Sequence, residues 1–137
     1  VTLGAPTGPF GFIYRKTDYA QPYFDGLKGA AVYPAFHVMA SLGQASGAER
    51  VDVKVSDPSQ VEALAFQAGG KTVLWLANLT SKPIKVALNG ATDKQIAILD
   101  AASCAQATTD PKALDVLRKP VGGDEIALDA YALARLD

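Results

Sequence analysis

The period of the hydrophobic pattern changes about one third of the way along the chain. Before residue 47, the stretch "VYPAFHVMASLG" (residues 32–43) repeats apolar side chains every three or four positions. This spacing predicts a helix with one apolar face. Pro34 suits the first turn of that helix, because a backbone N–H is not needed there. Gly43 or Gly47 is the expected end of the helix, since glycine readily closes a helix.

After residue 47 the period falls to two. In "RVDVKV" (residues 50–55), valines alternate with Asp52 and Lys54, which is typical of a half-exposed strand. Similar runs follow, separated by turn residues. We predict seven strands in this part of the chain: 50–55, 60–67, 71–79, 83–88, 95–100, 124–128 and 131–136. Short strands at such spacing favour an antiparallel sandwich.

Three further segments complete the predicted fold. "FGFIYR" (residues 10–15) alternates in the manner of a short strand, and Gly69-Gly70 predicts a hairpin turn because glycine reaches positive φ without strain. Residues 102–123 are the least regular, with at most one helical turn near 111–117. The predicted fold class is therefore mainly β: an antiparallel β-sandwich of about seven to eight strands preceded by one α-helix.

Aromatic residues are distributed unevenly. Of the one Trp, five Tyr and five Phe, eight lie between residues 10 and 36. We therefore interpret residues 1–47 and 48–137 as parts of two different cores. The chain begins at Val1, without an initiator Met or a signal-peptide pattern, so we expect it to be a piece of a longer protein.

Composition narrows the function classes. The chain has 137 residues, 49% hydrophobic and 20% charged, which is the profile of a soluble globular domain. With 13 Lys and Arg against 14 Asp and Glu, and no basic run, we expect no nucleic-acid partner. The apolar runs are too short to span a bilayer. The compartment, cytoplasm or periplasm, stays open.

The residues that most often do chemistry are sparse. One Cys and one His cannot build a zinc site or an internal disulfide, so we expect no metal and no cofactor. His37 is interpreted as a packed or capping histidine, and Cys104 as a small buried or half-buried residue. Asn78-Leu79-Thr80 matches the glycosylation pattern, but the favoured interpretation is that Asn78 and Thr80 satisfy backbone groups where a strand ends.

The stretch "YRKTDYAQPYFDG" (residues 14–26) is the one suggestive segment. Sugar rings stack on aromatic faces, and tyrosine adds a polar hydroxyl beside its apolar ring. The candidate substrate-binding residues are Tyr14, Arg15, Asp18, Tyr19 and Tyr23, with Asp25 beside them. The alternative is that these aromatic side chains pack against a neighbouring domain. No catalytic residue is assigned, because the carboxylates are scattered in sequence.

The order of elements resembles the C-terminal end of clan-A-type glycoside hydrolases, such as β-xylosidases and heparanase-like glucuronidases. The resemblance rests on "YPAFHVMASL" followed by "VEALAFQAGGKTVLWLANLT". A closer similarity is to the glycosidase-like family that contains D-apionate lactonases. In that clan the last barrel helix leads into a β-sandwich, and both catalytic carboxylates lie on earlier barrel strands. The resemblance implies that residues 1–47 are the remnant of a preceding barrel domain, and that residues 10–23 follow its last strand and border the substrate cleft.

These observations lead to three hypotheses. The first is a non-catalytic C-terminal accessory β-sandwich that packs on its own upstream catalytic barrel and stabilises it. We then expect no activity from this chain alone and a glycosidase-like hydrolase activity from the parent protein. The second is a freestanding carbohydrate-binding module, and the third is a protein-interaction domain. Under the first and third, we expect self-association through residues 1–47.

Overall fold

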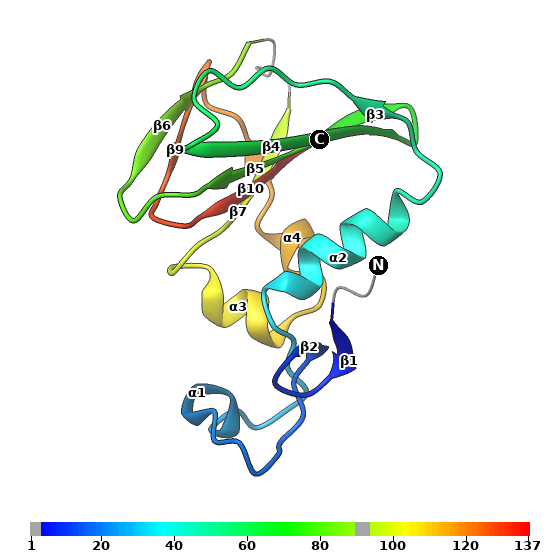
Figure 1. Cartoon of the computed structure of the whole chain (residues 1–137), viewed down its shortest axis with the longest axis vertical. Helices are drawn as coiled ribbons and strands as arrows, with labels where there is room; N and C mark the ends of the chain where they lie inside the picture. The colour runs from blue at the N-terminus through cyan, green and yellow to red at the C-terminus, as the bar shows by residue number, and fades with distance from the viewer. Residues whose placement is uncertain (1–3, 90–93) are drawn as a thin grey trace.

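A six-stranded antiparallel sheet forms the centre of the molecule, a computed structural model that describes residues 4–89 and 94–137. The spatial order of its strands is β3-β4-β5-β10-β7-β8 (Figure 1). Their bounds are β3 (Arg50–Val51), β4 (Val61–Ala68), β5 (Lys71–Asn78), β7 (Gln95–Leu99), β8 (Lys119–Pro120) and β10 (Leu133–Leu136). The strands longest in sequence, β4 and β5, form a hairpin.

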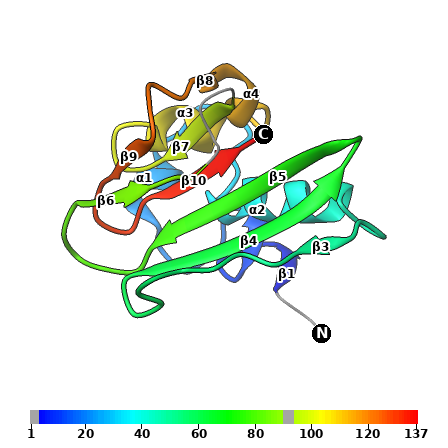
Figure 2. The ribbon, with the colours of Figure 1, turned by 90° about the horizontal axis from the view of Figure 1, so that it is seen from above.

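A second, two-stranded sheet covers one face of the first. It pairs β6 (Ile84–Ala87) with β9 (Glu125–Leu128) in antiparallel register (Figure 2). Because side chains alternate along a strand, every second residue of each sheet points into the space between them. The buried residues of this layer are Leu76, Leu88, Ile96, Val121, Ile126, Leu128, Ala132, Ala134 and Leu136. The predicted β-sandwich is therefore confirmed.

Helices cover the opposite face of the large sheet. They are α2 (Ala35–Gln44), α3 (Cys104–Thr109) and α4 (Ala113–Val116) (Figure 1). The buried residues between helices and sheet are Phe66, Val73, Trp75, Ala97, Leu99, Ala107, Ala113 and Leu114, with Val38 and Leu42 of α2 packed against them. The helix that precedes the sandwich thus shares a core with it. Among the described residues, no helix is long and apolar enough to cross a membrane.

The Gly69-Gly70 turn joins β4 to β5 as predicted. Ala68 and Lys71 are direct partners across the hairpin, which leaves only the two glycines in the loop. Their φ values are +57° and +77°. Two consecutive positive φ values belong to the turn type whose twist matches that of the flanking strands, and glycine adopts them without strain.

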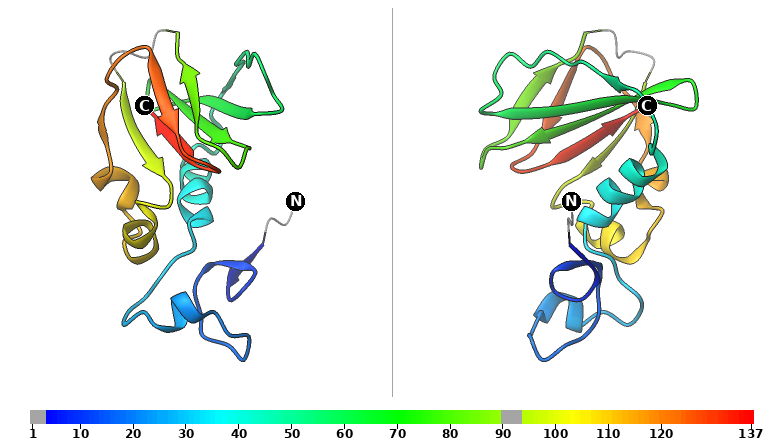
Figure 3. Two further views of the ribbon diagram at one scale, coloured as in Figure 1. Left: turned by 90° about the vertical axis from the view of Figure 1, so that its left-hand side faces the viewer. Right: turned by 45° about the vertical axis from the view of Figure 1, so that its right-hand side comes forward.

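The N-terminal part of the chain forms a small protrusion that we call the aromatic lobe (residues 4–33). It contains the parallel strands β1 (Ala5–Thr7) and β2 (Gly11–Ile13) and the helical turn α1 (Pro22–Asp25). Figure 3 shows it extending away from the two sheets. A β-bridge between Ile13 and Val32 closes the lobe. The Val32 N–H donates to the Thr108 carbonyl at 2.9 Å, which attaches the lobe to α3.

Several predicted boundaries were wrong. The strand expected over residues 50–55 pairs with β4 only at Arg50 and Val51, and the chain then leaves the sheet, so Val53 is 38% exposed. The strand expected over 131–136 begins at Leu133, because Tyr131 has a φ of +57° and belongs to the turn. The helix α2 ends at Gln44, one residue after Gly43. Gly47, with a φ of +80°, lies in the turn that follows the helix.

Residues 102–123 are more regular than expected. They form two short helices, α3 and α4, and the edge strand β8, where the sequence predicted at most one helical turn. The helix α3 reads "CAQATT", which has no apolar period to detect. It is held instead by burial of Ala107 and Thr108 against the rest of the core. Tertiary packing decides such short helices, because an isolated turn is unstable in water.

Candidate functional site

Three aromatic rings form the interior of the aromatic lobe. Tyr14 stacks on Phe24 with ring centroids 5.4 Å apart, and Phe24 lies 4.6 Å from Tyr33. Tyr14 also meets Tyr33 edge to face at 6.4 Å. Aromatic pairs in these arrangements are favourable beyond their buried area. The lobe is therefore held by a group of three half-buried rings that pack on one another.

A hydrogen-bond chain fixes the same rings. The Tyr14 hydroxyl donates to Asp25 Oδ1, and the Gln21 backbone N–H donates to Asp25 Oδ2 at 2.8 Å. The Tyr33 hydroxyl donates to Gln21 Oε1 at 2.7 Å. The hydrogen bond to the Asp25 carboxylate raises the pKa of Tyr14 from 10.0 to about 12, with desolvation as a smaller cause. The same bond, and that from the Gln21 N–H, lower the pKa of Asp25.

The residues predicted to bind substrate are placed differently from one another. Tyr14 turns into the lobe, where its hydroxyl is engaged by Asp25. Arg15 and Asp18 are exposed, and Tyr19 is 70% exposed. Tyr23 is 50% exposed and meets Phe24 edge to face at 5.3 Å. Tyr14 and Asp25 are thus brought together as a structural pair, while Tyr19 and Tyr23 present their rings to solvent.

Sequence reasoning missed one prominent residue of this surface and two of its supports. Phe10 is 87% exposed, the largest exposed fraction among the large hydrophobic side chains of the described chain. Gln21 and Tyr33 hold the interior through their hydrogen bond. The density of aromatic residues identified the region, but no periodic spacing indicates which of them point outward.

His37 and Cys104 have structural positions, as expected. His37 is 2% exposed, and its Nε2 lies 2.7 Å from the Ala107 carbonyl oxygen, which links α2 to α3. Cys104 is half-buried in α3, with its Sγ 4.0 Å from Thr108 Oγ1. Both interpretations made from the sequence are confirmed.

Asn78 closes the end of β5. Its side chain is 2% exposed, and Nδ2 donates to the carbonyls of Lys82, Leu128 and Asp129 at 2.8, 3.3 and 2.7 Å. Its Oδ1 accepts from the Thr80 N–H and hydroxyl. An asparagine that is buried, and whose amide nitrogen and oxygen both form hydrogen bonds, cannot serve as a glycosylation acceptor in the folded state. The interpretation that Asn78 and Thr80 satisfy backbone groups is therefore confirmed.

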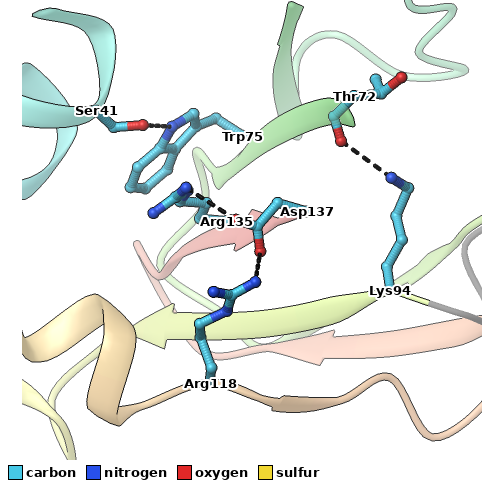
Figure 4. A network of polar contacts seen from close by, with 7 residues as sticks. All are labelled: Ser41, Thr72, Trp75, Lys94, Arg118, Arg135 and Asp137. Atoms are coloured by element: carbon cyan, nitrogen blue, oxygen red, sulfur yellow. Dashed lines mark hydrogen bonds and ion pairs between the residues drawn. The ribbon is translucent and has the colours of Figure 1, made fainter. Parts of the chain in front are cut away.

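A second polar network lies at the C-terminal end of the central strand β10 (Figure 4). Asp137 accepts from Arg118 Nη2 at 2.7 Å and from Arg135 Nη2 at 2.9 Å. Nearby, Lys94, the residue before β7, donates from Nζ to the carbonyl of Thr72 in β5 at 3.0 Å. Because the Asp137 carboxylate faces two guanidinium groups, its charge is used to hold the chain end and the residue before β8 together.

The family comparison decides what kind of domain carries this surface. The model of the family described as D-apionate lactonase, C-terminal immunoglobulin-like domain matches residues 58–136. The chain belongs to this family. The matched range includes β4 to β10, with five of the six strands of the large sheet, the whole smaller sheet and the helices α3 and α4 between β7 and β8. The family expected from the sequence is confirmed.

Two solved structures resemble this C-terminal domain. A GH30 endoxylanase from Clostridium papyrosolvens C71 is 19% identical, with a TM-score of 0.51, over 77% of this chain and 27% of that chain. CelM2, a bifunctional glucanase-xylanase protein from a metagenome library, is 18% identical, with a TM-score of 0.43, over 64% of this chain and 17% of that chain. This chain therefore spans about a quarter or less of either protein. No curated protein matches it.

The likeness to the endoxylanase concerns the fold. At this level of identity, side chains of a catalytic site cannot be transferred from one chain to the other. The expected similarity to part of a glycoside hydrolase is nevertheless confirmed at the level of architecture.

Proposed function

We propose that this chain is the non-catalytic C-terminal accessory β-sandwich of a glycoside hydrolase-like, carbohydrate-active protein, and that it packs on the catalytic part and stabilises it. The C-terminal position of the family domain supports a larger partner in the same polypeptide. The partner expected from the sequence resemblance is the upstream barrel. The aromatic lobe is the surface that would meet it.

The exposure of aromatic side chains on an ordered lobe carries this proposal. Phe10, Tyr19 and Tyr23 are 87%, 70% and 50% exposed, although the rings beneath them are stacked and hydrogen-bonded. Large apolar side chains exposed on one small lobe are a common feature of interaction surfaces. Burying one such side chain contributes about 1.5 to 3 kcal/mol. A catalytic domain seated on the lobe would supply that burial.

Three acidic side chains are engaged in local hydrogen bonds. Asp25 is bonded to Tyr14, and Asp57 accepts from Ser59. Asp100 and Ser103 bond each other's backbone N–H groups. Within the described ranges, no group of three or more His, Cys, Asp or Glu side chains could hold a metal ion. Lactonase and glycosidase assays on this chain alone should read blank, and turnover above background would refute the proposal.

The stabilising role is tested by substitutions in the lobe. Phe10→Ala and Tyr19→Ala should lower the unfolding temperature of the parent polypeptide by several degrees and leave that of the 137-residue chain nearly unchanged. The reason is that a side chain exposed in one form contributes packing only in the other. Leu79→Ala, which removes a 47% exposed side chain outside the lobe, is the matched control. Equal effects in both forms would contradict the proposal.

A carbohydrate-binding module is the second candidate, and the outward rings of Tyr19 and Tyr23 favour it. It predicts saturable binding of a glycan, weakened by Tyr19→Ala or Tyr23→Ala. Soluble xylan is a suitable probe, because the structural neighbour is an endoxylanase. Binding that both substitutions abolish would favour this function over the first.

A further inference from the structure

The sandwich is open along one side. On β10, the inward residues Ala134 and Leu136 are 0% exposed, because the smaller sheet covers them. On β4, at the same face of the large sheet, Val61 and Ala63 are only partly buried. Two strands cannot cover the width of six, and Figure 2 shows β4 and β5 extending past the smaller sheet. The inner face is therefore incompletely covered on the β4 side.

A groove with a mostly apolar floor occupies that side. Its floor includes Ala63, Ala65 and Leu74, and its two walls are the segment of residues 51–57 and the strand β6. Its volume is about 710 Å³. The floor is mostly aliphatic, and the walls mix valine, isoleucine and leucine with polar side chains such as Lys54 and Lys85. An uncovered apolar floor leaves hydrophobic stabilisation unrealised, and such surfaces usually receive a partner.

The strand β6 offers a hydrogen-bonding edge to the groove. Its partner in the described structure is β9 on the other side. The Leu88 N–H donates to the Asp124 carbonyl at 2.6 Å, which sets the alternation of the ladder. Bonds in an antiparallel pair alternate, so the N–H and C=O groups of Lys85 and Ala87 point away from β9 and toward the groove. An edge of this kind is a template for an added strand.

We propose that the groove receives an extended segment of the same longer polypeptide, from outside residues 1–137, which adds to β6 as a third strand of the smaller sheet. This inference rests on the proposed function, because it requires a larger protein. The domain is C-terminal in its family, and the similar part of the endoxylanase is 27% of that chain, so additional polypeptide accompanies this fold. A tethered segment has a high effective concentration, which favours it over a second copy or a free peptide. Alternate residues of the added strand would be apolar, to meet Ala63 and Leu74 on the floor.

Thiol labelling tests the inference. In a Cys104→Ala background, Val53→Cys places a thiol on one wall and Ala63→Cys places one on the floor; Ala127→Cys, exposed on the outer face of β9, is the control. Each variant is labelled with a small maleimide in the 137-residue chain and in the longer natural polypeptide. We expect the groove thiols to react in the short chain and at least tenfold more slowly in the longer one. The control should react equally in both.

Three results would overturn the inference. The first is equal labelling of the groove thiols in both forms. The second is protection already present in the dilute short chain, and the third is protection that grows with its concentration, which would assign the groove to a second copy. Amide hydrogen exchange at Lys85 and Ala87 separates strand addition from simple coverage, since only an added strand bonds these N–H groups. If the groove thiols are not protected while Phe10→Ala still destabilises the longer polypeptide, the accessory function stands and this inference alone fails.

Discussion

The indole N–H of Trp75 donates a 3.1 Å hydrogen bond to the Ser41 hydroxyl, and both residues are buried. Trp75 lies in the central strand β5, and Ser41 lies in α2. Figure 4 shows the two side chains meeting between helix and sheet. The contact joins α2 to the middle of the large sheet. This helix belongs to the aromatic-rich first part of the sequence, whereas the sheet is formed by the later part.

Removing either partner should destabilise the chain. Ser41→Ala leaves the Trp75 N–H buried without an acceptor, and Trp75→Phe removes the donor and part of the packed ring. We expect each to lower the free energy of unfolding by about 1 to 3 kcal/mol. The double variant should lose less than the sum of the two, by about 1 kcal/mol, because the two changes remove one shared contact. Urea unfolding measures these values. Tryptophan fluorescence follows it in the unsubstituted chain and in Ser41→Ala, which keep Trp75, and circular dichroism follows it in all variants. Additive losses would show that the hydrogen bond contributes nothing.

Asn78→Ala should be among the most damaging polar substitutions. It removes the donor shared by the carbonyls of Leu128 and Asp129 and the acceptor used by Thr80, at a site with 2% exposure. We expect a loss of roughly 2 to 4 kcal/mol in the free energy of unfolding, since several buried groups lose their partner. Asn89→Ala, at an exposed position, is the control and should change stability by less than about 0.5 kcal/mol. Comparable losses for the two would contradict the role given to Asn78.

The Asp25 carboxylate should set the pKa of the Tyr14 hydroxyl. Asp25→Asn removes the carboxylate that raises the pKa of Tyr14, so this pKa should fall from about 12 toward 10.0. Ultraviolet absorbance of tyrosinate during an alkaline titration measures it. Asp18→Asn, an exposed neighbour, should leave the titration unchanged. If Asp25→Asn also leaves it unchanged, the hydrogen bond does not exist in solution.

The same pair gives the lobe a defined pH range. The folded-state pKa of Tyr14 is raised, so its contribution to stability is fully present below the unfolded pKa of 10.0 and disappears as pH rises through about 12. The folded-state pKa of Asp25 is lowered, so its contribution is present above the ordinary carboxyl range and disappears as pH falls through the lowered value. The protection factors of residues 14–33, which divide the intrinsic exchange rate at each pH by the observed rate, should therefore fall at both extremes.

The sequence predicted the sandwich because its signals are local. Alternation at Ile84 and Val86, and the paired glycines 69 and 70, need only neighbouring residues to be recognised, and β6 and the β4–β5 hairpin form where expected. By contrast, α3 is a helix because Ala107 and Thr108 are buried by segments distant in sequence. Tertiary packing of this kind has no periodic signature, so the element was missed.

The candidate site was predicted in location and not in arrangement. The aromatic density of residues 10–36 identified the lobe, and Tyr19 and Tyr23 do face solvent. That Tyr14 turns inward depends on Asp25, eleven residues later, and no sequence rule joins the two. The open groove was not predicted either, because it arises where the segment after Val51 leaves the sheet instead of continuing as a strand.

Amide hydrogen exchange of the aromatic lobe, compared between the 137-residue chain and the longer natural polypeptide, measures directly whether this surface is covered by the rest of the protein. If the domain packs on the rest of its protein through this surface, exchange around Phe10, Tyr19 and Tyr23 should slow at least tenfold in the longer polypeptide. Exchange in the helix α4, which lies outside the lobe and carries the 61% exposed Val116, should be equal in both. Identical exchange of the lobe in the two forms would contradict the account.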